Sequence, residues 1–467
     1  MTALSSQPSS LKSPLRRQWL QGAAAAAALS PLALAFGARA QAGATPSRAP
    51  GYGPLRPVAD GTTGLPLLML PEGFSYRSFG WITEQLVEGG RIPGAPDGMG
   101  IVAVEGEVFT LVRNHEISHF DGSFGPAATH YDAPCGGGTV TLRYDRAQGR
   151  LIEARGSLSG TLVNCAGGTT PWGSWLSCEE TVSAAGQRIQ RGGQTHTAGR
   201  SHGWVFEVPA RGGSDARPLT ALGQFVHEAA VVDPADGIVY LTEDQGAAGF
   251  YRLLPRTPGR LADGGRLQML RARGASDLRS GLRTSQRWSV DWVDIEHPER
   301  GIDPTRGGRD GVLRQGVAQG ASVFARLEGV FVGPGEVWFT STSGGNAGAG
   351  QIWLLHPREQ VLELFHESPG AEVFDHPDNL CLAPNGAIVV CEDSRQPVQR
   401  LFGLTRKGEL FELARNNAQF NNEIPGLKGD FRGAEWAGAC FSPDGRTLFA
   451  NVYAPGFSVA ISGPFAA

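Results

Sequence analysis

The sequence predicts an all-β fold, and more specifically a six-bladed β-propeller with insertions at its rim. The chain has 66 glycines and 31 prolines among 467 residues. This glycine share is roughly twice the usual one, so tight turns are frequent and long helices are poorly supported. Six short apolar segments each follow a turn signal and end on polar or acidic residues. An internal repeat of this kind is typical of similar β-sheets arranged around an axis.

The six repeated strands are expected in the following order. Their apolar residues are 108–112, 173–176, 238–241, 337–340, 387–390 and 447–450. Their polar ends lie 64, 64, 98, 51 and 58 residues apart, at Glu116, Glu180, Asp244, Thr342, Asp393 and Asn451. The long third interval contains the stretch 256–319, rich in arginine and glycine, which we expect to insert over the rim.

Most of the repeated strands are expected to form a hairpin with an apolar run upstream. Turn sequences such as 233–237, 383–386 and 442–445 separate the two runs. The residues at the two ends of each hairpin are 14 to 16 positions apart, in the pairs Cys165 and Glu180, Glu228 and Asp244, Glu328 and Thr342, Asp378 and Asp393, and Glu435 and Asn451. Two short strands and a turn need about that length, so both residues of a pair lie at the same rim.

Further apolar strands complete the expected blades, at 138–144, 202–208, 250–254, 351–355 and 400–404. A β-sandwich or a pair of barrels is the alternative fold, but neither gives a reason why the same strand end is polar in every repeat. In a propeller the inner strands line a central channel, so their ends converge on one small volume.

The first 42 residues are expected to be a twin-arginine signal peptide. Arg16 and Arg17 precede a mild apolar stretch at 22–36, and small residues follow at 38–42. This stretch has 15 residues, too few to span a hydrocarbon core of about 30 Å. We therefore expect export by the twin-arginine machinery, no membrane span, one propeller domain over residues 43–467, and a periplasmic or secreted location. The net charge of −4 argues against nucleic acid or an anionic membrane surface as a partner.

Acidic residues at the strand ends are expected to face one another across the channel. They are Glu116, Glu180, Glu228, Asp244, Glu328, Asp378 and Asp393. Like-charge repulsion opposes such a gathering unless cations compensate it, and oxygen ligands in that number favour Ca²⁺. Cys165 takes the equivalent position in its blade, and a thiolate favours a softer, redox-capable metal such as iron.

These residues also have simpler interpretations. A carboxylate at a strand end is usually a turn cap or a solvated charge, and a single cysteine is more often a buried apolar residue or half of a disulfide. His115, His227 and His376 each neighbour a candidate acid, either as ligands or as groups that hydrogen-bond to ligands. Arg326 would share a face with Glu328 if the segment is a strand, and it suits an anionic substrate such as phosphate or a plain salt bridge.

The same residues carry a family resemblance. Seven segments resemble the motifs of the PhoX-type alkaline phosphatases, in order from about residue 70 to the C-terminus: 114–116, 164–180, 225–230, 240–244, 325–329, 376–379 and 441–445. The long second motif, which contains Cys165 and Glu180, is quite specific. The leader is consistent with this resemblance, since that family is exported by the twin-arginine route.

The resemblance implies a six-bladed propeller that holds a mixed iron and calcium cluster and hydrolyses phosphate monoesters at alkaline pH. Cys165 is similar in position to the cysteine that bridges iron, and Arg326 to the arginine that orients the phosphate. Arg326 and Glu328 are therefore the expected catalytic residues. The expected iron or calcium ligands are Glu180, Glu228, Asp244 and Glu328, while Glu116, Asp378 and Asp393 match motifs without an individual role.

Two other functions are compatible with a propeller of this composition. The first is a calcium-dependent lactonase or esterase, in which one channel Ca²⁺ polarises an ester carbonyl. The second is a non-catalytic binding propeller that uses calcium for stability. Neither explains Cys165 or Arg326, so a phosphatase acting on small phosphorylated substrates is the preferred prediction.

Overall fold

Antiparallel β-strands make up most of the described chain, which comprises residues 51–303 and 305–465 of the computed structural model. The proposed signal peptide, residues 1–42, lies outside these residues. The longest helix among the named elements is α3 (Gly311–Val317). No helix among the described residues has the length and apolar character needed to cross a membrane.

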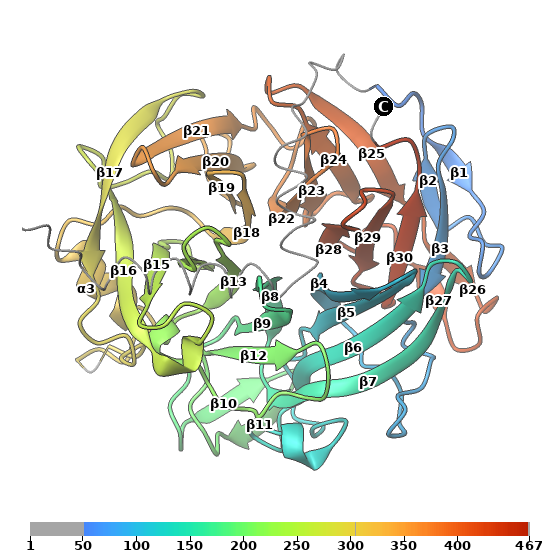
Figure 1. Cartoon of the computed structure of the whole chain (residues 1–467), viewed down its shortest axis with the longest axis horizontal. Helices are drawn as coiled ribbons and strands as arrows, with labels where there is room; N and C mark the ends of the chain where they lie inside the picture. The colour runs from blue at the N-terminus through green and yellow to red at the C-terminus, as the bar shows by residue number, and fades with distance from the viewer. Residues whose placement is uncertain (1–50, 304, 466–467) are drawn as a thin grey trace, which may run out of the picture.

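Six hairpins surround the centre of the molecule and point their first strands inward (Figure 1). They are β4 (Pro96–Glu105) with β5 (Val108–His115), β8 (Asn164–Thr169) with β9 (Ser174–Glu179), β13 (His227–Val232) with β14 (Val239–Glu243), β18 (Leu327–Gly333) with β19 (Glu336–Ser341), β22 (Pro377–Leu382) with β23 (Ile388–Glu392), and β28 (Trp436–Phe441) with β29 (Thr447–Val452). Each inner strand contacts the next, and β28 returns to β4, so the ring is closed. The second strands begin within one residue of the six predicted repeats, which confirms an all-β, propeller-like fold.

Outer strands extend these hairpins into sheets. They are β6 (Gly137–Asp145), β7 (Arg150–Thr161), β12 (Val205–Pro209), β15 (Phe250–Pro255), β16 (Gly265–Ala272), β20 (Gln351–His356), β21 (Val361–Glu367), β24 (Arg400–Leu404), β25 (Leu410–Asn416) and β30 (Phe457–Ser462). All five predicted outer strands are present, although β12 begins three residues later than expected. Two small hairpins stand apart from the sheets: β10 (Arg188–Arg191) with β11 (Gln194–Thr197), and β26 (Gln419–Asn421) with β27 (Lys428–Asp430).

The predicted six separate blades are wrong in one respect, because two of the strand sets join. Strand β17 (Arg287–Asp294) pairs with β16 on one side and with β21 on the other. The result is one nine-stranded sheet, in the order β13-β14-β15-β16-β17-β21-β20-β19-β18, beside four separate blades. The stretch 256–319 is therefore only partly a rim insertion, since it supplies β16 and β17 to the sheet.

The N-terminal strands complete the C-terminal sheets. Strand β2 (Leu68–Leu70) pairs with β25 and carries β1 (Arg56–Val58) on its outer side, while β3 (Ser75–Phe79) pairs with β30. Trp81, just after β3, stacks on Phe457 of β30 with ring centroids 4.2 Å apart. The two ends of the described chain are thus held together, and this keeps the ring of sheets closed.

Small residues allow the inner strands to lie against one another. A Cβ atom on Gly98 of β4 would lie 2.5 Å from Cα of Ala166 in β8, and one on Gly329 of β18 would lie 2.7 Å from the carbonyl oxygen of Asp378 in β22. Distances this short require backbone movement, because the neighbouring atoms belong to the main chain. The spacing of the inner strands is therefore set by backbone packing.

We predict that Gly98→Ala destabilises the protein by about 1–3 kcal/mol, because the added methyl group pushes β4 away from β8. Urea unfolding followed by tryptophan fluorescence measures the change. The control is Gly246→Ala, since a Cβ atom at Gly246 meets nothing within 4 Å. Equal stability of the two variants would contradict close packing of the inner strands.

Candidate metal centre

A β-bulge interrupts every inner strand near its start. In five strands the register shifts between the first and fourth residues, so the second residue is unpaired. Those second residues are Asp97, Cys165, Glu228, Glu328 and Asp378. A bulge bends its strand and re-aims the side chain it carries. The sixth strand, β28, has its bulge one residue later and carries no acid there.

A second ring of side chains follows directly after the second strand of each hairpin. Its members are Glu116, Glu180, Asp244, Thr342, Asp393 and Tyr453. The backbone N–H of each donates to a carbonyl just before the inner strand, over 2.7–3.2 Å, and the acceptors are Ala95, Val163, Val226, Arg326, His376 and Glu435. This repeated bond fixes both ends of each hairpin at one rim, as predicted from the hairpin lengths.

Four of the acceptor residues have a left-handed backbone conformation that residues other than glycine rarely adopt. Ala95, Val163, Arg326 and His376 have φ values between 46° and 53°. Strained positions of this kind persist where surrounding packing fixes them, and they gather at functional sites. Here they occur at the same position in four hairpins, immediately before the bulge that aims an acid or a thiol into the channel.

The two rings converge into one continuous group. Three sets of side chains each hold their ligand atoms within 4.8 Å of one another, and neighbouring sets share a member: Asp97, Glu116 and Cys165; Cys165, Glu180 and Glu228; Glu228, Glu328 and Asp378. The thiol of Cys165 donates to Oδ2 of Asp97 at 3.3 Å. None of the six cysteines, all of which are described, forms a disulfide.

Asp244 and Asp393 extend this group through carboxyl pairs. Glu180 hydrogen-bonds with Asp244, and Asp393 with Glu435. Every residue predicted as a metal ligand is therefore in or directly beside the group.

Burial of so many acids raises their pKa values. The pKa of Glu116 rises to about 7 and that of Glu328 to about 8, in both cases chiefly because of burial. Neighbouring carboxylates add to burial in raising the pKa values of five others well above their usual range, namely Asp97, Glu180, Glu228, Asp378 and Glu435. Such a site favours bound protons or bound cations.

The unpartnered oxygen atoms test whether a metal fits. Both carboxylate oxygens of Glu228 and Oδ1 of Asp97 are buried without a hydrogen-bond partner. A buried carboxylate without donors is costly unless a cation compensates it. Several carboxylates with one thiol suit a group of hard and softer metal ions, so these residues fit a metal cluster.

Arg326 is the cation that hydrogen-bonds to this group. Its Nε donates to Asp244 Oδ1 at 3.0 Å, and its Nη2 donates to Asp244 Oδ2 at 3.1 Å and to Glu328 Oε1 at 2.5 Å. It precedes β18 and is not part of a strand, contrary to one interpretation of the sequence. Although burial lowers the pKa of Arg326, the charge on Glu328 and the hydrogen bond with Asp244 raise it overall. The side chain is 34% exposed, so an anion in the channel can reach it.

The three histidines considered from sequence are not members of the metal-ligand groups found among the described residues. Nδ1 of His115 contacts the carbonyl of Gly94 at 2.8 Å, and Nε2 of His227 contacts that of Gly223 at 2.8 Å. Nδ1 of His376 lies 2.6 Å from Asp375. Each ring thus braces the loop before an inner strand.

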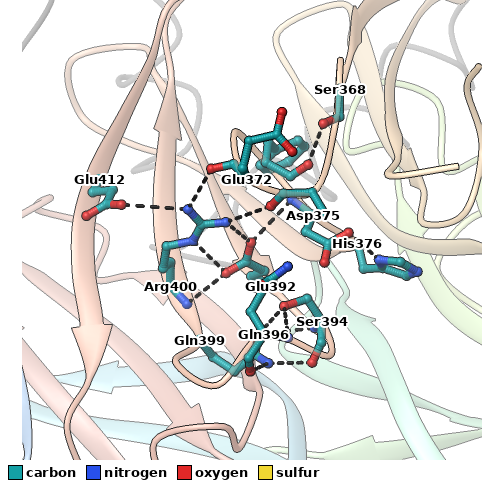
Figure 2. Close-up of polar contacts among 12 residues, drawn as sticks. Ser368, Glu372, Asp375, His376, Glu392, Ser394, Gln396, Gln399, Arg400 and Glu412 are labelled. Carbon is teal, nitrogen blue, oxygen red and sulfur yellow. Dashed lines mark hydrogen bonds and ion pairs between the residues drawn. The ribbon is translucent and has the colours of Figure 1, made fainter. Parts of the chain in front are cut away.

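Glu392 is a buried carboxylate that lies outside the channel group and supports the loop before β22. Figure 2 shows Glu392, the last residue of β23, which accepts hydrogen bonds from Nη2 and Nε of Arg400 at 2.6 and 2.9 Å. It also accepts the N–H of Asp375 at 3.2 Å, next to His376. Glu392 therefore faces away from the channel and fixes the loop that leads to Asp378.

The sequence interpretation missed three residues of the group: Asp97, Glu435 and Tyr453. Asp97 lies 19 positions before Glu116 because β4 and β5 are long, so it fell outside the spacing of the other hairpins. Glu435 was paired with Asn451, but its carbonyl receives the N–H of Tyr453, whose hydroxyl hydrogen-bonds with Glu116. Asn451 instead donates to the carbonyl of Asp97 at 2.5 Å.

One known family matches the sequence of this chain. The sequence signature of the family described as alkaline phosphatase PhoX matches residues 150–456. No functionally curated protein matches the sequence. Among solved structures, Pseudomonas fluorescens PhoX in complex with vanadate, a transition state analogue, is 17% identical with a TM-score of 0.62, over 88% of this chain and 97% of that one. The Cps50 (Swd1) β-propeller domain of Myceliophteria thermophila is 10% identical with a TM-score of 0.32, over 80% and 83% of the two chains.

We predict that the metal-free protein loses stability as the pH rises. In the folded protein the pKa values of Glu116 and Glu328 are about 7 and about 8, whereas an ordinary glutamate in the unfolded chain has a pKa of 4.5. As the pH rises, the unfolded state therefore releases these protons before the native state does. This stabilisation is present below about pH 4.5 and is lost as the pH rises through about 8. Thermal unfolding of chelator-treated protein between pH 5 and 9 measures it.

The matched control is Glu116→Gln, which removes one of the titrating groups and is expected to weaken the pH dependence. Added calcium is expected to restore most stability at the alkaline end. The same pH dependence in both proteins would contradict this account of Glu116.

Proposed function

The chain belongs to the PhoX alkaline phosphatase family and is a phosphomonoesterase; we propose that it hydrolyses small phosphate monoesters at an iron and calcium cluster held in the propeller channel. The observation that carries this proposal is the buried group of acids with Cys165 among them and Arg326 beside them. A lactonase or a binding propeller would need neither the thiol nor the arginine.

We assign the metal ligands from this group. Cys165 would hold iron, because a thiolate is a poor ligand for calcium. The carboxylates would complete the iron and calcium sites, and they are Glu116, Glu180, Glu228, Asp244, Glu328, Asp378 and Asp393, with Asp97 added from its contact with Cys165. The unpartnered oxygens of Glu228 support its place at the centre of the cluster.

Bound metal ions supply Lewis-acid stabilisation of the charge on phosphoryl oxygens. The protein contributes position and charge. Arg326 is held by Asp244 and Glu328 through Nε and Nη2, so Nη1 can donate to a phosphate oxygen. Glu328 acts as a catalytic partner of Arg326 by fixing its guanidinium plane, and a fixed donor is more effective than a mobile one in the transition state.

We further propose that residues 1–42 direct export by the twin-arginine machinery and that residues 43–467 act as one periplasmic or secreted domain. The paired arginines and the mild apolar stretch support this. Export in the folded state would allow the cluster to be assembled around Cys165 before the protein leaves the cell.

We predict that purified protein contains iron and calcium and turns over p-nitrophenyl phosphate at alkaline pH, and that Cys165→Ser loses both iron and activity. Elemental analysis and turnover are measured on one sample, from the periplasm of a twin-arginine-competent host. Cys440→Ser, which changes a cysteine outside the ligand groups, is the control and should behave as wild type. Calcium without iron and no turnover would contradict the cluster and favour a lactonase or a binding propeller.

We predict that Arg326→Gln lowers kcat/KM for p-nitrophenyl phosphate about 100- to 1,000-fold, because it removes a charged donor to the transferring group. The kcat/KM of Arg326→Lys should lie between those of wild type and Arg326→Gln, because lysine keeps the positive charge but lacks the planar guanidinium. Arg271→Gln is the control, because that arginine pairs with Asp291 on the outer strands β16 and β17. Unchanged kcat/KM in Arg326→Gln would show that Arg326 is only a structural salt bridge.

A further inference from the structure

A second group of metal-binding side chains lies apart from the channel cluster. Asp132, Cys135 and His202 hold their ligand atoms within 4.8 Å of one another, and all three residues are buried. Nε2 of His202 lies 3.5 Å from Oδ2 of Asp132 and 3.9 Å from Sγ of Cys135. This group shares no member with the three sets in the channel.

The ring of His202 is held in one orientation by Glu179. Nδ1 of His202 lies 2.6 Å from Oε1 of Glu179, whose Oε2 accepts the N–H groups of Gly203 and Trp204 at 2.8 and 3.1 Å. Glu179 is fully buried and its Oε1 also accepts the N–H of Leu162 at 3.0 Å. A carboxylate on one ring nitrogen is the usual support for a histidine whose other nitrogen binds metal.

His196 of β11 points its Nε2 toward the same place. That nitrogen is buried without a hydrogen-bond partner and lies 3.9 Å from Oδ2 of Asp132. The ring packs against Phe120, with centroids 5.0 Å apart. Oδ2 of Asp132 thus lies near two imidazole nitrogens, Nε2 of His196 and Nε2 of His202.

We propose that Asp132, Cys135, His196 and His202 form a structural zinc site, with Glu179 orienting His202. One sulfur, two imidazole nitrogens and one carboxylate oxygen are a four-ligand set that suits tetrahedral Zn²⁺. The distances among Asp132, Cys135 and His202 allow a shared ion, and His196, whose Nε2 lies 3.9 Å from Oδ2 of Asp132, would move closer to complete the set. The site goes beyond the phosphatase activity and does not depend on it.

The position of the site explains what zinc would do there. The four ligands come from the segment before β6, the hairpin β10–β11 and the segment before β12. The apolar cluster around Cys135 is small, and its buried members are Cys135, Leu162 and Val163. A metal link can add stability where one side of a site rests on so small a cluster.

The hairpin that zinc would hold also reaches the rim of the channel. Arg191, at the end of β10, is partly buried, and the charges of Glu180 and Glu116 act on it. Its Nη2 donates to Oγ1 of Thr181 at 2.8 Å. Gln194 fastens the hairpin further, because its Oε1 accepts the N–H of Phe120 at 2.8 Å. Zinc would thus fix a cationic side chain near the entrance to the proposed active site.

A competing account needs no metal. His202 could carry a proton on each nitrogen and lie as a cation between Glu179 and Asp132. That account leaves Nε2 of His196 without a partner and assigns no role to the thiol of Cys135. The two accounts differ in whether Cys135 and His196 affect zinc content.

The test is zinc retention by chelator-treated protein that has been reloaded with Zn²⁺ in excess calcium and then desalted. We expect the wild-type protein to retain about one zinc ion per chain. The variants Cys135→Ser and His196→Gln should both lose this ion. Cys165→Ser, which changes the thiol of the channel, should retain it, as should Cys440→Ser. His196 lies on a surface hairpin, so its variant remains informative if Cys135→Ser folds poorly.

A second measurement separates binding from contamination. Zinc is expected to raise the Tm of metal-free wild type and of Cys165→Ser by several degrees, and to leave the Tm of Cys135→Ser unchanged. Equal zinc content and equal Tm response in Cys135→Ser and Cys165→Ser would overturn the site and favour the protonated histidine. Loss of phosphatase activity alone would not bear on either outcome.

Discussion

Like-charge repulsion inside the channel is the constraint on which the rest of this structure depends. Five inner strands each bring an acid or a thiol to the same small volume, and their exit positions bring more. The backbone offsets this cost by fixing the side chains so firmly that they cannot move apart. A bulge aims each residue inward, and a hydrogen bond from the exit residue to the carbonyl before the strand closes each hairpin at the rim.

Adjacent carboxylates at these rims do different work because successive side chains of a strand point to opposite sides. Glu180 joins the channel group, whereas Glu179, one residue earlier, is fully buried behind it and binds His202 and three backbone N–H groups. Glu243 and Glu392 behave like Glu179 in their own hairpins, where they bind Tyr251 and Arg400. Each of these acidic pairs therefore places one residue in or beside the channel group and uses the other as a brace behind it.

The position of Arg326 follows from the same arrangement. Its backbone has the left-handed conformation of the residues before the bulges, and its carbonyl accepts the N–H of Thr342. Thr342 stands where four of the other hairpins have an acid, so this exit position is uncharged and Arg326 adds a cation just before the inner strand. Among the described residues, the guanidinium fixed between Asp244 and Glu328 is the positive charge that hydrogen-bonds to the channel group.

The sequence by itself determined the features that depend on short stretches of chain. Both strands of a hairpin and its turn lie within about 16 residues, so the repeats, the polar rims and the places of Cys165, Glu228 and Asp378 could be predicted from spacing. Only the tertiary structure decided the features that depend on pairing between segments far apart in the sequence. Strand β17 fuses two sets of strands, β2 and β3 complete sheets near the C-terminus, and Tyr453 meets Glu116 of the neighbouring hairpin where the ring closes. Local sequence patterns do not predict these contacts, because the unpaired backbone groups of an edge strand can bond to any other strand.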